Sequence, residues 1–200
     1  VESVLIPTET RTTACVSSQV GCSLNCEFCA TARLKRMRNL EVAEIVDQVA
    51  LIDRQSKLYF DRPLSNIVFM GMGEPMMNYK NVVESIKKIT DPKGLGMSPR
   101  RITVSTSGIP KMIKMLADEN LRVKLALSLH SKKKKKRNEI MPFSDKFPLT
   151  DIMDSLKYWY EKTGNIITFE YCVWKGINDQ DEDIKALIKI MDINNEEQKI

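Results

Sequence analysis

The sequence has few of the residues from which closed metal sites are built. Its 200 residues include one histidine, His130, and five cysteines, and no second Cys-x2-Cys pair completes a four-ligand zinc site. No apolar run reaches the roughly 18 residues of a membrane-spanning helix. The first residues also lack the basic, apolar and small-residue segments of a secretory signal. We therefore expect a cytoplasmic protein with reduced thiols and no membrane partner.

The composition is that of a folded domain with an uneven distribution of positive charge. Apolar residues make up 42% and charged residues 28% of the chain, enough for one core and one or at most two domains. Basic residues gather at Arg33, Lys35, Arg36 and Arg38 and again in an unbroken block at positions 132–137. Such clusters suit a polyanionic partner, because neutralising phosphates releases counterions. A solvated face is the simpler interpretation of the lysine run at 132–136.

Three cysteines, Cys22, Cys26 and Cys29, lie within one short stretch with the spacing C-x3-C-x2-C. Thiolates are the usual ligands of iron–sulfur clusters, and a four-iron cluster normally takes four of them. With three thiolates, one iron stays open to a small molecule. A zinc site is the alternative. A structural disulfide is a weaker one, because three clustered cysteines cannot all pair with one another.

The pattern of the chain predicts an α/β fold in which strands and helices alternate. Five βα units in succession imply a mostly parallel sheet. Residues 1–11 precede the first of these strands and are expected to form an extension or hairpin, and residues 191–200 read as a polar tail. The expected strands are 14–20, 66–70, 101–105, 123–129 and 166–173, and the expected helices are 42–55, 79–90, 111–118, 150–163 and 182–190.

Small and polar residues follow the middle strands. The runs are Gly71-Met72-Gly73-Glu74-Pro75, Ser105-Thr106-Ser107-Gly108 and Ser128-Leu129-His130. Ligands of parallel α/β folds bind at the carboxyl ends of strands, so these motifs and the cysteine loop should meet at one rim. Gly73 permits close backbone approach, Glu74 offers an acceptor to a cation, and the serines can donate to a carboxylate or a ribose. Ordinary turn and capping roles are the alternative. Cys172 reads as strand core.

The residues of these motifs and their order along the chain resemble those of the RlmN/Cfr family of radical S-adenosylmethionine (SAM) RNA methyltransferases. The resemblance begins with Arg11-Thr12-Thr13-Ala14-Cys15-Val16-Ser17-Ser18-Gln19-Val20-Gly21-Cys22 and continues through Asn66-Ile67-Val68-Phe69-Met70-Gly71 and the later motifs, to about residue 190. It implies a partial (β/α)6 TIM-like barrel over 12–190, with about five βα units present.

The resemblance also implies cofactors and residue roles. Cys22, Cys26 and Cys29 would hold a [4Fe-4S] cluster, and the amino and carboxylate groups of SAM would chelate its open iron. Cleavage of SAM would then give a 5′-deoxyadenosyl radical. Glu2 would accept a proton and Cys15 would help to resolve an enzyme–RNA adduct. The residues implied in the SAM pocket are Gly73, Glu74, Ser105, Ser128, Leu129 and His130.

The implied reaction is methylation of C2 of adenosine in 23S rRNA and tRNA, with an electron donor such as flavodoxin and a monomeric enzyme. Methylation at C8, as in the Cfr type, and a non-catalytic metal-binding RNA module are the alternatives. The family's methyl-carrying cysteine, an asparagine-bearing strand and an N-terminal helical domain have no counterpart in these 200 residues. We therefore expect a fragment that can start SAM cleavage but does not complete turnover.

Overall fold

A computed structural model describes residues 1–196, with side chains to residue 190, and its centre is a six-stranded sheet. The strand order is β1-β2-β5-β6-β7-β8. Only the edge strand β1 runs antiparallel to its neighbour; the remaining pairs are parallel. A two-stranded ribbon of β3 and β4 lies apart from the sheet. The strands are β1 Val4–Pro7, β2 Thr12–Cys15, β3 Gln19–Val20, β4 Arg38–Asn39, β5 Asn66–Phe69, β6 Ile102–Thr106, β7 Lys124–Ser128 and β8 Ile167–Glu170.

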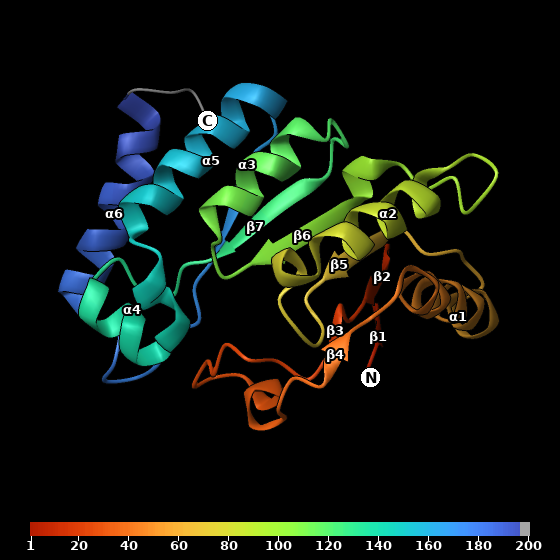
Figure 1. The fold of residues 1–200 in the computed structure, drawn as a ribbon, viewed down its shortest axis with the longest axis horizontal. Coiled ribbons are helices and arrows are strands. Elements are labelled where there is room, and N and C mark those ends of the chain that lie inside the picture. The colour runs from red at the N-terminus through yellow and green to blue at the C-terminus, as the bar shows by residue number, and fades with distance from the viewer. Residues whose placement is uncertain (197–200) are drawn as a thin grey trace.

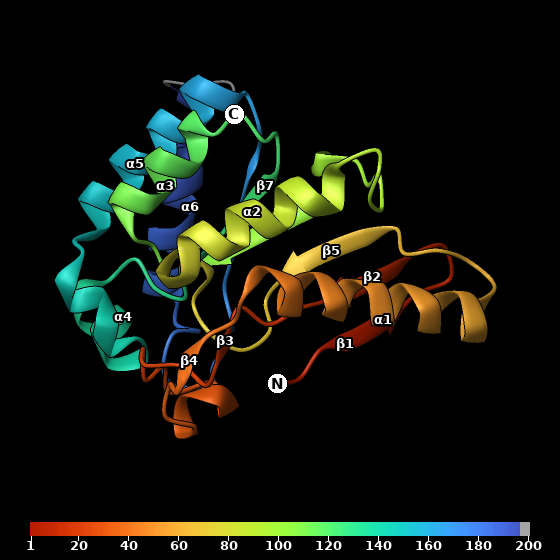
Figure 2. The ribbon, with the colours of Figure 1, turned by 45° about the vertical axis from the view of Figure 1, so that its right-hand side comes forward.

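Helices connect the parallel strands and cover the outer face of the sheet (Figure 1 and Figure 2). The main helices are α1 Val42–Phe60, α2 Tyr79–Thr90, α3 Pro110–Asp118, α4 Lys134–Ile140, α5 Leu149–Thr163 and α6 Asp181–Glu196. Each parallel strand is followed by a helix, which confirms the expected five βα units and the partial barrel. In the part of the chain described here, no helix is both long and apolar enough to span a membrane.

One apolar core fills the space between this helical layer and the sheet. Ile67, Val104 and Leu125 from neighbouring strands are buried there against Ile86 of α2 and Trp159 of α5. Burial of apolar surface from both layers stabilises the fold, at roughly 25 cal/mol per Å². It also fixes the ends of the parallel strands relative to one another.

Most expected elements are present with small shifts at their ends. The segment expected to be an extension or hairpin contains β1, which pairs antiparallel with β2. Helix α1 continues to Phe60, five positions beyond its expected end at 55. Helix α4 was not expected, since its lysine-rich sequence shows no apolar periodicity. Helix α6 runs to Glu196, into the segment interpreted as a polar tail, and residues 197–200 lie outside the described part.

The expected single strand at 14–20 is wrong, because the chain breaks between β2 and β3 at Ser17. There the backbone pairs with a side chain instead of a strand. The Ser17 N–H donates to Gln48 Oε1 at 2.9 Å, and Gln48 Nε2 donates to the Ser17 carbonyl at 3.1 Å. Both residues are buried, so this amide from α1 satisfies backbone groups that would otherwise be unpaired. The break directs the following residues toward the cysteine loop.

Replacing Gln48 should therefore destabilise the fold. We expect Gln48→Leu to lower the free energy of unfolding by about 2–3 kcal/mol, because two buried backbone groups lose their partners. Urea denaturation followed by circular dichroism measures this. Gln55→Leu, on the exposed face of the same helix, is the matched control and should change stability by less than about 0.5 kcal/mol. Equal effects of the two changes would contradict the role of Gln48.

Candidate functional site

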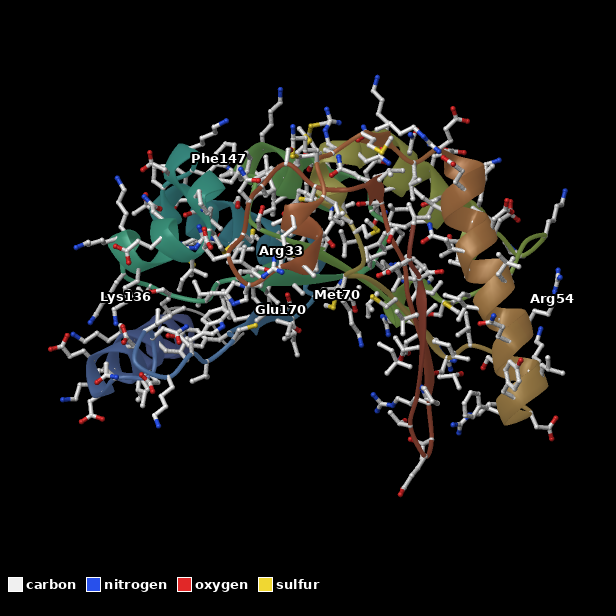
Figure 3. The ribbon with its side chains drawn as sticks, turned by 90° about the horizontal axis from the view of Figure 1, so that it is seen from below. Arg33, Arg54, Met70, Lys136, Phe147 and Glu170 are labelled. Carbon is white, nitrogen blue, oxygen red and sulfur yellow. The ribbon has the colours of Figure 1, made fainter. Side chains whose placement is uncertain are left out.

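A cavity of about 470 Å³ lies at the carboxyl ends of the parallel strands, within the size range of small-molecule sites. Figure 1 shows the cysteine loop crossing below these strand ends. In Figure 3, the labelled Met70 and Glu170 lie close together at the centre of this region. The residues that line the cavity come from the cysteine loop, the segment after β5 and the ends of β6, β7 and β8. They include Cys22, Cys26, Phe28, Cys29, Met70, Gly73, Glu74, Ser105, Ser128, His130, Glu170 and Cys172.

The loop that carries Cys22, Cys26 and Cys29 is shaped by backbone contacts. Gly21 has φ +74° and lies so close to the Lys35 carbonyl that an added Cβ would sit 2.3 Å from its oxygen, which favours glycine there. The Cys29 N–H donates to the Cys26 carbonyl at 3.0 Å. Cys29 is followed by a short 3-10 helix, Ala30–Arg33. All three thiols are half-buried and line the same cavity, as the spacing predicted.

The charge environment of the thiols is unfavourable to thiolates when no cation is present. Burial raises the pKa of Cys26 to about 12, and the neighbouring Cys22 and Cys29 add to the increase. Burial also raises the pKa of Cys22. Among the described residues, no three Cys, His, Asp or Glu side chains are gathered closely enough to surround one metal ion. A cation bound here would supply the charge that deprotonated thiols need.

Glu74 joins two of the strand-end motifs. It is 4% exposed, and its carboxylate accepts hydrogen bonds from the Met76 N–H at 3.0 Å and the Ser107 N–H at 2.8 Å. Burial raises the pKa of this carboxyl, although the backbone donors counteract the increase. Glu74 therefore holds the segment after β5 against the end of β6.

Gln19, which the sequence analysis missed, supports the adjacent Gly73. The Glu74 N–H donates to Gln19 Oε1 at 3.0 Å. Gly73 has φ +95°, and an added Cβ would lie 2.5 Å from Gln19 Cβ. Glycine is thus needed both for the backbone conformation and for the close approach. The result is a bare stretch of backbone facing the cavity.

His130 carries a buried donor that no described residue uses. Its side chain is buried, and Nδ1 accepts a hydrogen bond from the Cys172 N–H at 3.1 Å. Burial lowers the pKa of His130 to about 4, so the ring is neutral at pH 7 and the proton is on Nε2. Nε2 is buried without a partner in the described structure. The ring packs against Phe28 and Trp174, with centroids 4.5 and 5.8 Å away, and these two rings contact each other at 5.4 Å.

The backbone of His130 is itself unusual. Its φ is +52°, a left-handed conformation that few non-glycine residues adopt. Such conformations are most common at functional sites. Leu129, the preceding residue, is fully buried and is not among the residues that line the cavity. Its contribution to the rim is a backbone one, because its N–H donates to the Glu170 carbonyl at 3.0 Å.

Arg137 is a second residue that the sequence analysis did not assign to the site. It is 2% exposed and donates to the carbonyls of Ser107, Ser128 and Leu129 at 2.8, 3.2 and 3.2 Å. Burial lowers the pKa of Arg137 to about 10, and the nearby Cys26 acts in the opposite direction. Arg137 therefore ties the ends of β6 and β7 together and adds positive charge beside the thiol loop.

The interpretation of the lysine run at 132–136 as a solvated face is correct only in part. Lys134 and Lys135 are exposed. Lys133 lies 2.8 Å from Glu182, and Lys136 lies 2.6 Å from Asp183, so these two lysines pair with the start of α6. In Figure 3, the labelled Lys136 lies between α4 and α6. The block mainly fastens α4 to α6 and to the rim, a function that its composition does not reveal.

Three remaining candidates differ in position. Glu2 is exposed, and its backbone carbonyl accepts a hydrogen bond from Ser17 Oγ. Cys15 is half-buried on β2, where burial raises its pKa and the Met70 backbone is a hydrogen-bond partner. Neither Glu2 nor Cys15 is among the lining residues of the cavity. The expectation that Cys172 is strand core is wrong: β8 ends at Glu170, and Cys172 is exposed at the cavity.

Comparison with known proteins identifies this arrangement. The model of the Radical SAM superfamily matches residues 16–188, which include the cysteine loop and every strand-end motif. The chain belongs to the radical SAM superfamily. A radical SAM methyltransferase from Sphaerobacter thermophilus has the same fold, with a TM-score of 0.92 and 39% identity over 94% of this chain and 55% of that one.

Curated relatives narrow the resemblance to the RlmN type. The chain is 69% identical to the "Probable dual-specificity RNA methyltransferase RlmN" of Flavobacterium psychrophilum and 67% identical to that of Christiangramia forsetii. Each match covers 94% of this chain and 54% of the relative. The resemblance inferred from the motifs is therefore confirmed. The chain spans about half the length of the relatives that it matches.

The buried neutral state of His130 makes the radical SAM barrel sensitive to acid. The unfolded chain binds a proton near pH 6.5 and the folded chain only near pH 4, so the free energy of unfolding should fall between these values. We expect a loss of about 1–2 kcal/mol by pH 5 in the cluster-free protein. His130→Asn keeps an acceptor for Cys172 and tolerates the backbone conformation. Denaturant melts from pH 7.5 to 5 should show a shallower decrease for this variant; parallel curves would refute the assignment.

Loss of Arg137 should loosen the rim. Arg137→Met removes a buried donor from three carbonyls, of which that of Leu129 keeps the Ser131 N–H, and we expect a decrease in unfolding free energy of about 3 kcal/mol. Thermal and urea unfolding provide the measurement. Lys134→Met, an exposed change on the same helix, serves as the control and should stay within about 0.5 kcal/mol of the unmodified chain. A similarly small effect at Arg137 would show that its hydrogen bonds contribute little.

Proposed function

We propose that this chain is the catalytic barrel of an RlmN-type RNA methyltransferase, which methylates C2 of adenosine in 23S rRNA and tRNA. The observation that carries the proposal is that the three thiols and the strand-end motifs line one cavity. The sequence identity of 67–69% to proteins named as RlmN supports methylation at C2 over methylation at C8, the chemistry of the Cfr type.

The residues at the cavity fit a [4Fe-4S] cluster. Cys22, Cys26 and Cys29 would supply three thiolates, which leaves one iron for a small ligand. When bound, the cluster supplies one electron that cleaves SAM and yields a 5′-deoxyadenosyl radical. The half-buried loop limits access of water to the thiols, and the buried Arg137 would offset part of the negative charge of the cluster.

The same cavity has features that fit SAM. Its volume of about 470 Å³ suits a ligand of this size. The uncovered backbone at Gly73 allows a close approach, Glu74 fixes that backbone in place, and His130 lines the wall beside them. Leu129 would act indirectly, because its backbone N–H and carbonyl are bonded to Glu170 and Arg137 and hold the pocket wall together. Ser105 and Ser128 complete the polar part of the wall.

The remaining roles follow from the same resemblance. Exposed Arg33 and Lys35 lie in the segment after the cysteine loop, where they can contact RNA phosphates. Cys15 would resolve the RNA adduct; it does not line the cavity, but it is hydrogen-bonded to the backbone of Met70, which does. Glu2 would accept a proton during the reaction. We infer a cytoplasmic monomer that receives electrons from a donor such as flavodoxin.

The cysteine triad provides the test. We expect the reconstituted chain to bind iron and sulfide and to release 5′-deoxyadenosine from SAM with a strong reductant. Cys22→Ala, Cys26→Ala and Cys29→Ala should each reduce this product to the level of cluster-free protein, because a thiolate ligand is lost. Cys172→Ala is the matched control, since this thiol lines the cavity but lies outside the triad. It should retain the cluster and the product.

Two results would contradict the proposal. One is stoichiometric zinc binding by a chain that takes up no iron, which would favour the metal-binding module. The other is 5′-deoxyadenosine formation that persists in the triad variants. Iron, sulfide and zinc analysis after anaerobic reconstitution distinguishes the two metals directly.

A further inference from the structure

Glu170, the last residue of β8, brings together the ends of three strands. Its Oε2 accepts hydrogen bonds from Ser105 Oγ at 3.0 Å and Ser128 Oγ at 3.2 Å. Its backbone carbonyl accepts from the N–H groups of Leu129 and His130 at 3.0 and 3.3 Å. The carboxylate is half-buried and lines the cavity. This role could not be predicted from the sequence, because Glu170 stands there as one polar residue within an expected strand.

The carboxylate has capacity left for a ligand. No residue in the described part of the chain forms a salt bridge with Glu170, and no hydrogen bond to its Oε1 is found there. Arg137, the buried cation nearby, directs its hydrogen bonds to backbone carbonyls instead. This part of the cavity therefore presents an acceptor with negative charge.

The hydrogen bonds to Glu170 determine what the two serines can offer to a ligand. A hydroxyl has one proton to donate, and Ser105 and Ser128 both give it to Glu170. Toward the cavity they present lone pairs, which accept hydrogen bonds. The SAM carboxylate would meet these acceptors and a like charge, which disfavours it here. Of the two groups expected to bind these serines, the geometry thus argues against the SAM carboxylate and leaves the ribose.

The other groups of SAM can be compared with the same surface. The amino group carries the charge that a carboxylate attracts, but under the proposed function it would chelate the open iron together with the SAM carboxylate, so neither group is free to pair with Glu170. The ribose carries two neighbouring hydroxyls, both donors, and no charge. A vicinal diol matches a carboxylate oxygen flanked by hydroxyl lone pairs.

We propose that Glu170 binds the ribose hydroxyls of SAM and determines selectivity for an intact ribose, with Ser105 and Ser128 orienting its carboxylate. This inference rests on the proposed function, since it assumes that the cavity takes SAM. It adds the end of β8 to the expected SAM pocket and gives the serines an indirect role.

The test compares SAM with its 2′-deoxy and 3′-deoxy analogues. Dissociation constants are measured by equilibrium dialysis on the anaerobically reconstituted chain, without reductant, so that no turnover is required. We expect the unmodified chain to bind SAM at least about tenfold more tightly than either deoxy analogue. Glu170→Ala should weaken SAM binding by about 10- to 100-fold, as expected for hydrogen bonds to a charged group. The deoxy analogue should lose much less, so the preference should disappear.

Two variants control for structure. Glu170→Gln keeps the size of the side chain and an oxygen acceptor for the serines, and it decides the question if Glu170→Ala fails to fold. It should reduce the preference for SAM over the deoxy analogues. Glu161→Ala, an exposed change on α5, should leave both affinities unchanged. Thermal unfolding of each variant monitors the fold.

The outcomes separate this inference from the proposed function. If the unmodified chain binds SAM without a preference for the intact ribose, the role of Glu170 is refuted and SAM binding stands. The same holds if SAM and the deoxy analogues weaken equally in the Glu170 variants, which is the result for a purely structural residue. If the unmodified, iron-loaded chain binds no SAM, both the inference and the proposed function fail.

Discussion

The buried carboxylate of Glu74 is the interaction on which the rest of the site depends. It accepts from backbone N–H groups on its own turn and at the end of β6, while the N–H of the same residue is held by Gln19 from β3. A buried carboxylate is stable only when its oxygens are hydrogen-bonded. The three segments are thus held in one arrangement, and the backbone at Gly73 stays open to the cavity.

Two further charged side chains, Arg137 and Glu170, connect the strand ends across the rest of the rim. Arg137 donates to three carbonyls at the ends of β6 and β7, and Glu170 accepts from side chains and backbone at the same two ends. Hydrogen bonds to charged groups are stronger than those between neutral ones, which makes them suitable for fixing strand ends. These hydrogen bonds hold the strand ends of the cavity wall together, and Phe28 of the cysteine loop packs against this wall at His130.

Much of the fold could be predicted because apolar periodicity and turn residues report local structure. Helix α2 was expected with its observed bounds, and four of the parallel strands were expected within three residues at each end. The errors have identifiable causes. The break at Ser17 depends on Gln48, thirty-one positions later, and α4 forms in a lysine-rich segment that gains stability from pairing with α6. Neither contact leaves a signal in the local pattern.

The sequence by itself determined the superfamily and the set of cofactor candidates, because the C-x3-C-x2-C spacing and the order of the strand-end motifs are local features that a linear reading preserves. Only the tertiary structure decided which polar groups are paired within the protein and which keep capacity to spare. His130 Nε2 is left without a partner, Glu170 takes the protons of both serines, and Glu74 is used by the backbone. The reason is physical: a hydrogen bond between residues far apart in sequence depends on the packing that brings them together, and the spacing of residues along the chain does not encode it.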